Sequence, residues 1–373
     1  MAEWQMVRLG SIIKTNQNTF SPKDNWKFVN YLDTGNITMN RIDEIQYIDM
    51  TTDQLPSRAR RKVKYNSILY STVRPNQLHY GIIKEQPDNF LVSTGFAVID
   101  VDEEKAVPDY IYYVLTQQEV TERLHAIAEQ SVSAYPSLKP VDIENLDVLL
   151  PDIETQRKVV SILSSIDGKI KENAEINNNL EQQAFALFDS LFPRTIDGSQ
   201  AIGDYINPKR GRNLLSKDAV YGTVPVVAGG LEPSTYHNVA NTKAPVLTIS
   251  ASGANAGFVN LWLNPVWSSD SSYIDSSMTP NVFFWYILLK GRQKEIFDAQ
   301  TGSAQPHIYP QHIAAMPVGD LNQELVSQFT TQVAPLFELI GANKDENERL
   351  RNIRDALLPR LMSGEIDVSD ICI

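Results

Sequence analysis

The sequence predicts an α+β protein in which two globular domains alternate with two long helices. The chain has 373 residues, more than one ordinary hydrophobic core requires. Its second half repeats the plan of the first half. In each half, short β-type runs and a helix precede a long stretch with heptad periodicity. We therefore expect a pseudo-twofold tandem repeat whose two long helices pair as an antiparallel coiled coil.

The composition is typical of a folded protein without an overall basic surface. Apolar residues make up 42% of the chain, charged residues 21%, and the formal net charge is -12. The only cysteine, Cys372, excludes a disulfide within one chain and a cysteine-based metal site. No apolar run approaches the roughly 20 residues that a membrane span needs. We expect a cytoplasmic protein that would bind nucleic acid only through local basic patches or together with partners.

The internal repeat is clearest in a Ser/Gly-rich loop. Ser133-Ala134-Tyr135-Pro136 returns as Ser303-Ala304-Gln305-Pro306, an offset of 170 residues. A solenoid needs three or more short repeats, whereas two long repeats indicate a pseudo-twofold molecule. Such symmetry suits a partner that itself has a twofold axis, as duplex DNA does.

The first globular domain is predicted at residues 1–150 and the second at residues 194–320. In the first, β-type runs at 67–71 and 90–101 precede a helix that begins at Pro108. In the second, runs at 224–227 and 246–249 precede a helix that begins at Pro280. Gly, Pro, Asn and Asp separate the strands.

The two spacer segments, 151–193 and 321–373, contain the long helices, predicted at 154–192 and 324–362. A strict 4-3 alternation continues for about five heptads in each, which predicts a left-handed coiled coil. In the first helix this seam consists of Val159, Leu163, Ile166, Ile170, Asn173, Asn177, Leu180, Ala184, Leu187 and Leu191. At the corresponding positions of the second helix, nine of the ten residues keep their polar or apolar class, and Arg354 is the exception.

Asparagines at matching places in the two seams predict the register. In an antiparallel pair, Asn173 would face Asn347 and Asn177 would face Asn343. Buried asparagines cost stability but penalise every slipped register. The alternative, in which each helix lies only on its own domain, is less favoured because a helix of this length extends about 57 Å at about 1.5 Å per residue.

Two segments of the first domain are candidates for DNA contact. The densest basic stretch is expected on a loop or at the start of the 67–71 strand, and a polar loop follows that strand. Arginine and lysine bind phosphates, and arginine, asparagine, glutamine and histidine can bond to base edges. A solvated charged loop and a structural turn are the respective alternatives. The candidate residues are Arg58, Arg60, Arg61, Lys62, Lys64, Arg74, Asn76, Gln77 and His79.

The second domain offers two comparable segments. One is basic and includes Gly211, which would allow close backbone approach to a phosphate. The other, 250–257, is rich in small residues and could offer N–H groups and hydroxyls, or could simply connect two strands. The candidates here are Lys209, Arg210, Arg212, Asn213, Ser252 and Asn255.

No catalytic or metal site is predicted. Asp88 followed by Glu103-Glu104-Lys105 only superficially resembles a nuclease constellation. His307 and His312 are flanked by prolines and do not share a helix face. We expect either a sequence-specific DNA-binding protein or, as the alternative, a non-enzymatic two-headed coiled-coil scaffold that binds proteins.

Three stretches resemble the specificity (S) subunits of type I restriction-modification systems. Residues 151–163, followed by Ile166-Asp167, are similar to the family's opening of the central helix. Residues 356–366 resemble its C-terminal close, and residues 4–10 resemble the start of its first target-recognition domain. The match is loose in the regions that the family varies. The second helix departs from the family pattern at Leu321-Asn322-Gln323-Glu324.

This resemblance implies that each globular domain is a target-recognition domain for one half of a split site on double-stranded DNA. It implies that the helices set the spacing and bind methyltransferase (M) subunits, expected to number two. Restriction (R) subunits then join. The chain itself would hold no cofactor, because S-adenosylmethionine, ATP and Mg would bind to the partner subunits, and it would catalyse no reaction.

Overall fold

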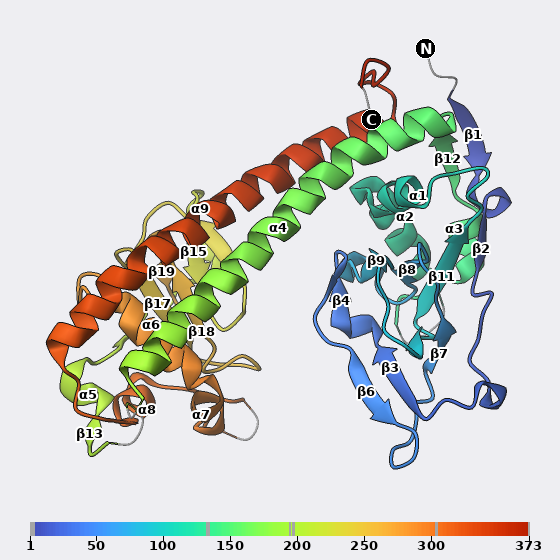
Figure 1. Cartoon of the computed structure of the whole chain (residues 1–373). Coiled ribbons are helices and arrows are strands. Elements are labelled where there is room, and N and C mark those ends of the chain that lie inside the picture. Colours follow the sequence, from blue (N-terminus) through green and yellow to red (C-terminus); the bar gives the residue numbers. More distant parts are fainter. Residues whose placement is uncertain (1–3, 132–134, 194, 196–197, 303–304, 372–373) are drawn as a thin grey trace. The chain divides into compact units, whose positions relative to one another are not determined.

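The computed structural model describes residues 4–131, 135–193, 195, 198–302 and 305–371 (Figure 1). Cys372 and parts of both Ser/Gly-rich loops (132–134 and 303–304) lie outside these residues. The chain forms two compact units, which we describe separately: unit 1 comprises residues 1–169 and 349–373, and unit 2 comprises residues 170–348. Each unit contains sheets and helices, so the predicted α+β class is confirmed. Among the described residues, no helix is long and apolar enough to cross a membrane.

Unit 1 contains two four-stranded sheets, with strand orders β6-β3-β10-β7 and β2-β11-β8-β9. All pairs are antiparallel except β3 with β10. Their strands are β2 (Ile13–Thr15), β3 (Phe28–Leu32), β6 (Gln46–Asp49), β7 (Ala59–Lys62), β8 (Ile68–Ser71), β9 (Tyr80–Ile82), β10 (Phe90–Ser93) and β11 (Phe96–Val101). Two short pairs join β1 (Gln5–Arg8) to β12 (Asp147–Leu150) and β4 (Ile37–Thr38) to β5 (Arg41–Ile42).

The predicted run 90–101 is two strands, because Thr94-Gly95 separates β10 from β11. Leu32 and Val92 of the first sheet and Leu69 and Val98 of the second belong to one buried cluster. This cluster joins the two sheets of unit 1. Short 3-10 helices connect the strands: η1 (Leu9–Ser11), η2 (Pro22–Asp24), η3 (Thr34–Asn36) and η4 (Pro75–Gln77).

Unit 1 also contains three short helices: α1 (Pro108–Thr116), α2 (Gln118–Glu129) and α3 (Pro140–Glu144). Helix α1 begins at Pro108 as predicted, since proline at the first helical position lacks only an N–H that would be unpaired anyway. Ile111 and Leu115 of α1 are fully buried in the main core of unit 1.

Unit 2 is built around sheets of order β14-β20-β17-β18 and β16-β15-β19, with the short pair β13-β21. The strands are β13 (Gln200–Ala201), β14 (Lys209–Arg210), β15 (Val224–Val227), β16 (Thr235–His237), β17 (Val246–Ser250), β18 (Val259–Trp262), β19 (Trp267–Ser268), β20 (Ser271–Asp275) and β21 (Pro317–Val318). The helices are α5 (Ile202–Tyr205), α6 (Val282–Gly291), α7 (Gln293–Asp298) and α8 (Pro310–Ala314), with the 3-10 helix η5 (Ser216–Asp218).

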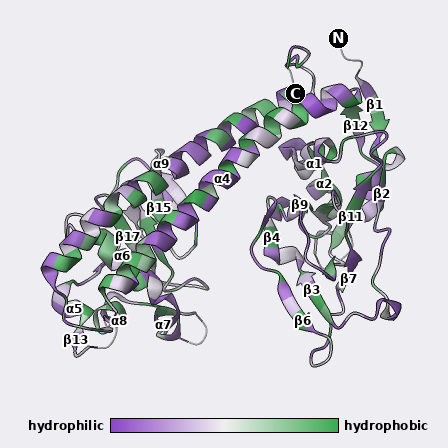
Figure 2. Cartoon of the chain, viewed as in Figure 1, coloured by the Kyte–Doolittle hydropathy of each residue, from purple (hydrophilic) through white to green (hydrophobic). Residues whose placement is uncertain are grey.

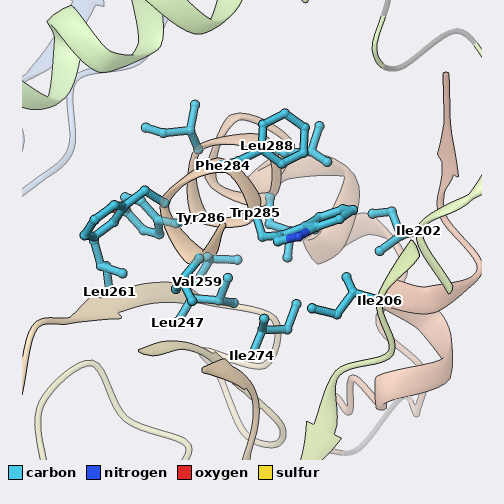
Figure 3. Packing of buried hydrophobic residues seen from close by; sticks show 14 of the residues in the cluster. Ile202, Ile206, Leu247, Val259, Leu261, Ile274, Phe284, Trp285, Tyr286 and Leu288 are labelled. Carbon is cyan, nitrogen blue, oxygen red and sulfur yellow. The ribbon is translucent and has the colours of Figure 1, made fainter. Parts of the chain in front are cut away.

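Helix α6 is apolar on all sides and forms the centre of the unit 2 core (Figure 3). Trp285 points toward Ile202 and Ile206, and the sheet residues Leu247 and Ile274 lie beneath the helix. The helix was expected to begin at Pro280. It begins two residues later because Asn281 has a non-helical backbone and donates its N–H to the Thr279 hydroxyl.

The long helices are α4 (Ile153–Leu191) and α9 (Gln323–Met362). Helix α4 begins one residue before the predicted position because Asp152 caps it, accepting from the Thr155 N–H at 2.9 Å. Polar and apolar residues alternate along both helices (Figure 2). Each helix begins in one unit and ends in the other, so each unit contains a portion of both.

Paired asparagines join the helices in unit 2. Asn173 donates to Asn347 at 2.9 Å, and Asn343 donates to Asn177 at 2.8 Å. The numbers rise along one helix and fall along the other, so the helices are antiparallel here. The structure thus brings together the residues that the heptad register places opposite each other, and Asn347 also donates to the Ile170 carbonyl at 3.1 Å.

The start of α4 is bonded to the segment that precedes α1 in unit 1. Gln156 is fully buried, accepts from the Val107 N–H at 2.8 Å and donates to the Pro151 carbonyl at 2.8 Å. Gln156 therefore fixes the residue that precedes α1. At the equivalent place in unit 2 stands Val326, which is also buried. The second helix therefore lacks the side chain that makes these two hydrogen bonds in the first helix.

We expect Asn173→Leu to destabilise unit 2, because Asn347 loses a buried amide partner. We expect the free energy of unfolding to fall by about 1–3 kcal/mol. The double variant Asn173→Leu, Asn347→Leu should regain most of it, because apolar replacement of both partners leaves no unpaired group. Urea unfolding monitored by circular dichroism measures the change, with the exposed Asn178→Leu on the same helix as control. Equal stability of Asn173→Leu and Asn178→Leu would contradict a stabilising role for the Asn173–Asn347 pair.

Candidate nucleic-acid interface

The basic segment of unit 1 lies on a strand, which corrects the expectation of a loop or strand start. Residues 59–62 form β7, whose register with β10 pairs Arg61 with Val92. On its other side β7 accepts from Phe20 and donates to Asn18 through its backbone. These two sets of backbone bonds make the segment extended. Because side chains alternate along a strand, Arg60 and Lys62 lie on one face and Arg61 on the other.

The cations of this segment differ in their partners. The Lys62 ammonium is 2.5 Å from the Asp24 carboxylate and lies 5.2 Å from the centroid of Trp26. The hydrogen bond from Lys62 is the main cause that holds the pKa of Asp24 below its usual value. Lys62 is therefore already paired within unit 1. Arg60 donates to the Ser57 carbonyl at 3.2 Å, and Arg58 lies in the field of Asp33.

Arg61 differs from its neighbours. Its Nε atom is buried and has no hydrogen-bond partner, and burial lowers the pKa of the guanidinium. In the part of the chain that the structure describes, Arg61 forms no ion pair. A partly desolvated cation without a carboxylate is costly, and an incoming anion such as a phosphate would compensate it.

The polar loop after β8 has a fixed conformation. Arg74 and Leu78 have positive φ angles of 48° and 58° on either side of η4. The Arg74 guanidinium carbon lies 4.9 Å from the centroid of the Tyr135 ring. The His79 ring Nδ1 is 2.7 Å from the Ile37 carbonyl oxygen, so part of its bonding capacity serves the fold.

Asn76 and Gln77 are exposed within this loop, and so is Lys64 after β7. Left-handed backbone at non-glycine residues is unfavourable and is retained where the surroundings impose it, often at functional positions. The loop thus presents two amide side chains from a constrained backbone.

In unit 2 the structure brings the two candidate segments together. Arg210 of β14 and Ser252 of the β17–β18 connection both contact the carboxylate of Asp270. Asn213 is close to Ser269, on the same turn as Asp270. Asp270 was not identified from the sequence, because it is 60 residues from Arg210 and nothing local marks it.

Gly211 has a packing role. A Cβ at this position would lie 2.5 Å from the Ser268 carbonyl oxygen, so only glycine lets β14 approach the β19–β20 turn. Arg212 is exposed, and its carbonyl accepts from the Trp267 indole at 2.8 Å. Lys209 and Asn255 are exposed and half-buried, respectively.

The sequence also did not single out an exposed tyrosine of unit 2. Tyr221 is 97% exposed, yet its neighbours are anchored. The Val220 N–H donates to the His237 ring at 2.9 Å, and a side chain on Gly222 would meet the His237 carbonyl. The sequence carries no signal for this, because the anchoring contacts come from β16.

Groups for metal binding are lacking among the described residues, which contain no cluster of three or more His, Cys, Asp or Glu side chains with suitable placement. His307 stacks on Tyr309, whose ring also contacts His312 edge-on. The two histidines thus take part in local aromatic packing.

Comparison with known proteins identifies relatives along the whole chain. Residues 1–182 match the family described as "Type I restriction modification DNA specificity domain". The HindI specificity subunit of Haemophilus influenzae is 25% identical, in an alignment that covers 98% of this chain and 100% of that protein. The MjaIX specificity subunit of Methanocaldococcus jannaschii is 24% identical, covering 94% and 87% respectively.

A solved structure shares the fold. The S subunit of a type I restriction-modification system from M. genitalium superimposes with a TM-score of 0.56 at 18% identity, covering 97% of this chain and 96% of that one. The likeness therefore extends over both units and both long helices.

Proposed function

This chain belongs to the family of type I restriction-modification specificity subunits, and from that premise we propose that it is the sequence-specific DNA-binding subunit of such a complex. It recognises a split DNA target and directs the methyltransferase and restriction subunits to it. The chain is non-catalytic. The observation that carries this proposal is the family match together with specificity-subunit relatives along nearly the whole chain. The alternative of a protein-binding scaffold gains no support from these relatives.

Each half of the target is assigned to one globular domain, residues 1–150 and 194–320. Both domains present a basic segment on a strand, β7 in unit 1 and β14 in unit 2, which supports this assignment. The spacers, 151–193 and 321–373, contain α4 and α9, which run through both units. Their length therefore sets the gap between the two halves of the target.

The proposed DNA contacts of unit 1 centre on β7. Arg61 is the strongest candidate for a DNA contact, because its guanidinium is partly desolvated and has no carboxylate partner among the described residues. Arg58, Arg60, Lys62 and Lys64 provide further phosphate contacts. In unit 2, Lys209, Arg210, Arg212 and Asn213 serve the same role, with Ser252 and Asn255 beside them. Arg74, Asn76, Gln77 and His79 are proposed to bond to base edges or to phosphates in the first domain.

The partner subunits provide the positive surface and the cofactors that this chain lacks. With a net charge of -12, this subunit gains part of its affinity for DNA from positive surface on its partners. We propose that two methyltransferase subunits bind to the paired helices and that restriction subunits then join. S-adenosylmethionine, ATP and Mg belong to these partners. Since its DNA partner lies in the cytoplasm of a bacterium or archaeon, we place the protein there.

The proposed function predicts a split methylation motif. The chain should be co-expressed with its adjacent methyltransferase gene, and the host DNA sequenced by a single-molecule method that detects modified bases. We expect two short constant sequences separated by a gap of fixed length. A continuous motif would contradict the two-domain proposal, and methylation independent of this chain would contradict its role.

Replacing Arg61 should weaken DNA binding without changing the target. We expect Arg61→Ala to reduce the affinity of the assembled complex and to lower the slope of log K against log salt by about one. Fluorescence anisotropy at several salt concentrations measures both. Lys105→Ala is the control, because Lys105 is a basic residue of unit 1 paired with Asp102 outside β7. If Arg61→Ala leaves the slope of log K against log salt unchanged, Arg61 does not contact a DNA phosphate.

Lengthening α4 and α9 should lengthen the gap between the two halves of the DNA target. Four residues inserted after Asn177 in α4 and after Ala342 in α9, which face each other, add about 6 Å and about 40° of rotation. One to two base pairs of DNA add about 3.4 Å and about 34° each. We therefore expect the gap to grow by one or two base pairs while both constant sequences remain. Methylation sequencing measures this, and an unchanged gap would refute the spacing role.

A further inference from the structure

Unit 1 contains a pocket of about 720 Å³. It lies among η4, helices α1 and α2, and those ends of α4 and α9 that belong to unit 1. A volume of this size is typical of a small-molecule site. The proposed DNA contacts do not account for this pocket, although Asn76 reaches its rim.

One wall of the pocket is aromatic. Tyr80 and Tyr112 are only 6% and 8% exposed, and their ring centroids lie 6.3 Å apart. Both line the pocket, and neither hydroxyl has a hydrogen-bond partner among the residues that the structure describes. Burial raises the pKa of Tyr80 to about 12, so this phenol is neutral at physiological pH and its oxygen can accept a hydrogen bond.

The rest of the lining is acidic. Four carboxylates and one guanidinium line the pocket, which leaves a formal charge of three negative units. Arg354 is already paired with carboxylates, because it donates to Asp167 at 2.8 Å and to Asp355 at 2.9 Å. Glu119 and Glu122 on α2 are exposed and carry two of these three negative units.

The repeat shows that the architecture does not require this pocket. At the offset of 170 residues, Asp167 corresponds to Phe337 and Arg354 corresponds to Ala184. In unit 2, Phe337 stacks on Phe283 at 4.7 Å, and Ala184 is fully buried in the core. Aromatic packing therefore occupies in unit 2 the place that polar groups line in unit 1. Arg354 is also the residue that breaks the seam pattern.

We propose that this pocket binds a small linear organic cation of the aliphatic polyamine class. Its ammonium groups would pair with Glu119 and Glu122 and donate to the free phenol oxygens. Aromatic faces attract organic cations in addition. Its methylene chain would lie against Leu78 and Leu358, which also line the pocket. This binding goes beyond the proposed function and does not depend on it.

Spermidine is the probe, titrated into the full-length chain at physiological ionic strength by calorimetry. We expect saturable one-site binding. The variant Glu119→Gln, Glu122→Gln should weaken it by about tenfold or more, since two charge-assisted contacts are lost. The control Glu103→Gln, Glu104→Gln removes the same charge from an exposed turn of unit 1 and should change the affinity less than about twofold.

A second variant separates a specific site from general attraction to an acidic protein. Tyr112→Phe keeps the ring and removes the free hydroxyl. It should therefore weaken the binding of spermidine without altering the thermal midpoint of unfolding. Binding that does not saturate would overturn the proposal. Equal weakening by the two charge variants, or full affinity in Tyr112→Phe, would also overturn it.

Discussion

The two amide pairs between α4 and α9 are the constraint on which the structure depends. Asn173 and Asn347 are 1% and 5% exposed, so each amide must find its partner inside the helix pair. An unpaired buried amide costs about 1–3 kcal/mol, and slipping the helices by one heptad would place at least three of the four asparagines opposite aliphatic residues. Since both helices run through both units, one register fixes the helix ends in each unit at once.

The helix ends are parts of the domain cores. Val159 and Leu163 of α4 pack with Leu361 of α9 in the core of unit 1. In unit 2, Phe188 of α4 contacts Phe329 of α9 edge-on at 5.7 Å, and both belong to the same cluster as helix α6. A register change would therefore disrupt the packing of the helix ends in both hydrophobic cores.

The features predictable from the sequence are those with a local or periodic signal. The heptad pattern predicted α4, α9 and their antiparallel pairing, and Pro108 marked the start of α1. What the sequence could not reveal depends on pairing between distant residues. β7 is a strand because β10 and residues 18–20 bond to it on both sides, and Asp270 joins Arg210 to Ser252 only after the sheet forms. Arg354 is the residue that breaks the seam pattern, but the sequence does not reveal that it pairs with Asp167.

The negative charge of the chain is consistent with selective DNA recognition. Non-specific affinity for DNA arises from phosphate neutralisation and grows with the number of free cations. Here several basic residues of the proposed interface are already paired, Lys62 with Asp24 and Arg210 with Asp270. Breaking such a pair costs free energy that only a well-placed set of DNA contacts can offset. Non-specific binding therefore stays weak, and the ratio of specific to non-specific affinity, which decides target choice in a genome, increases.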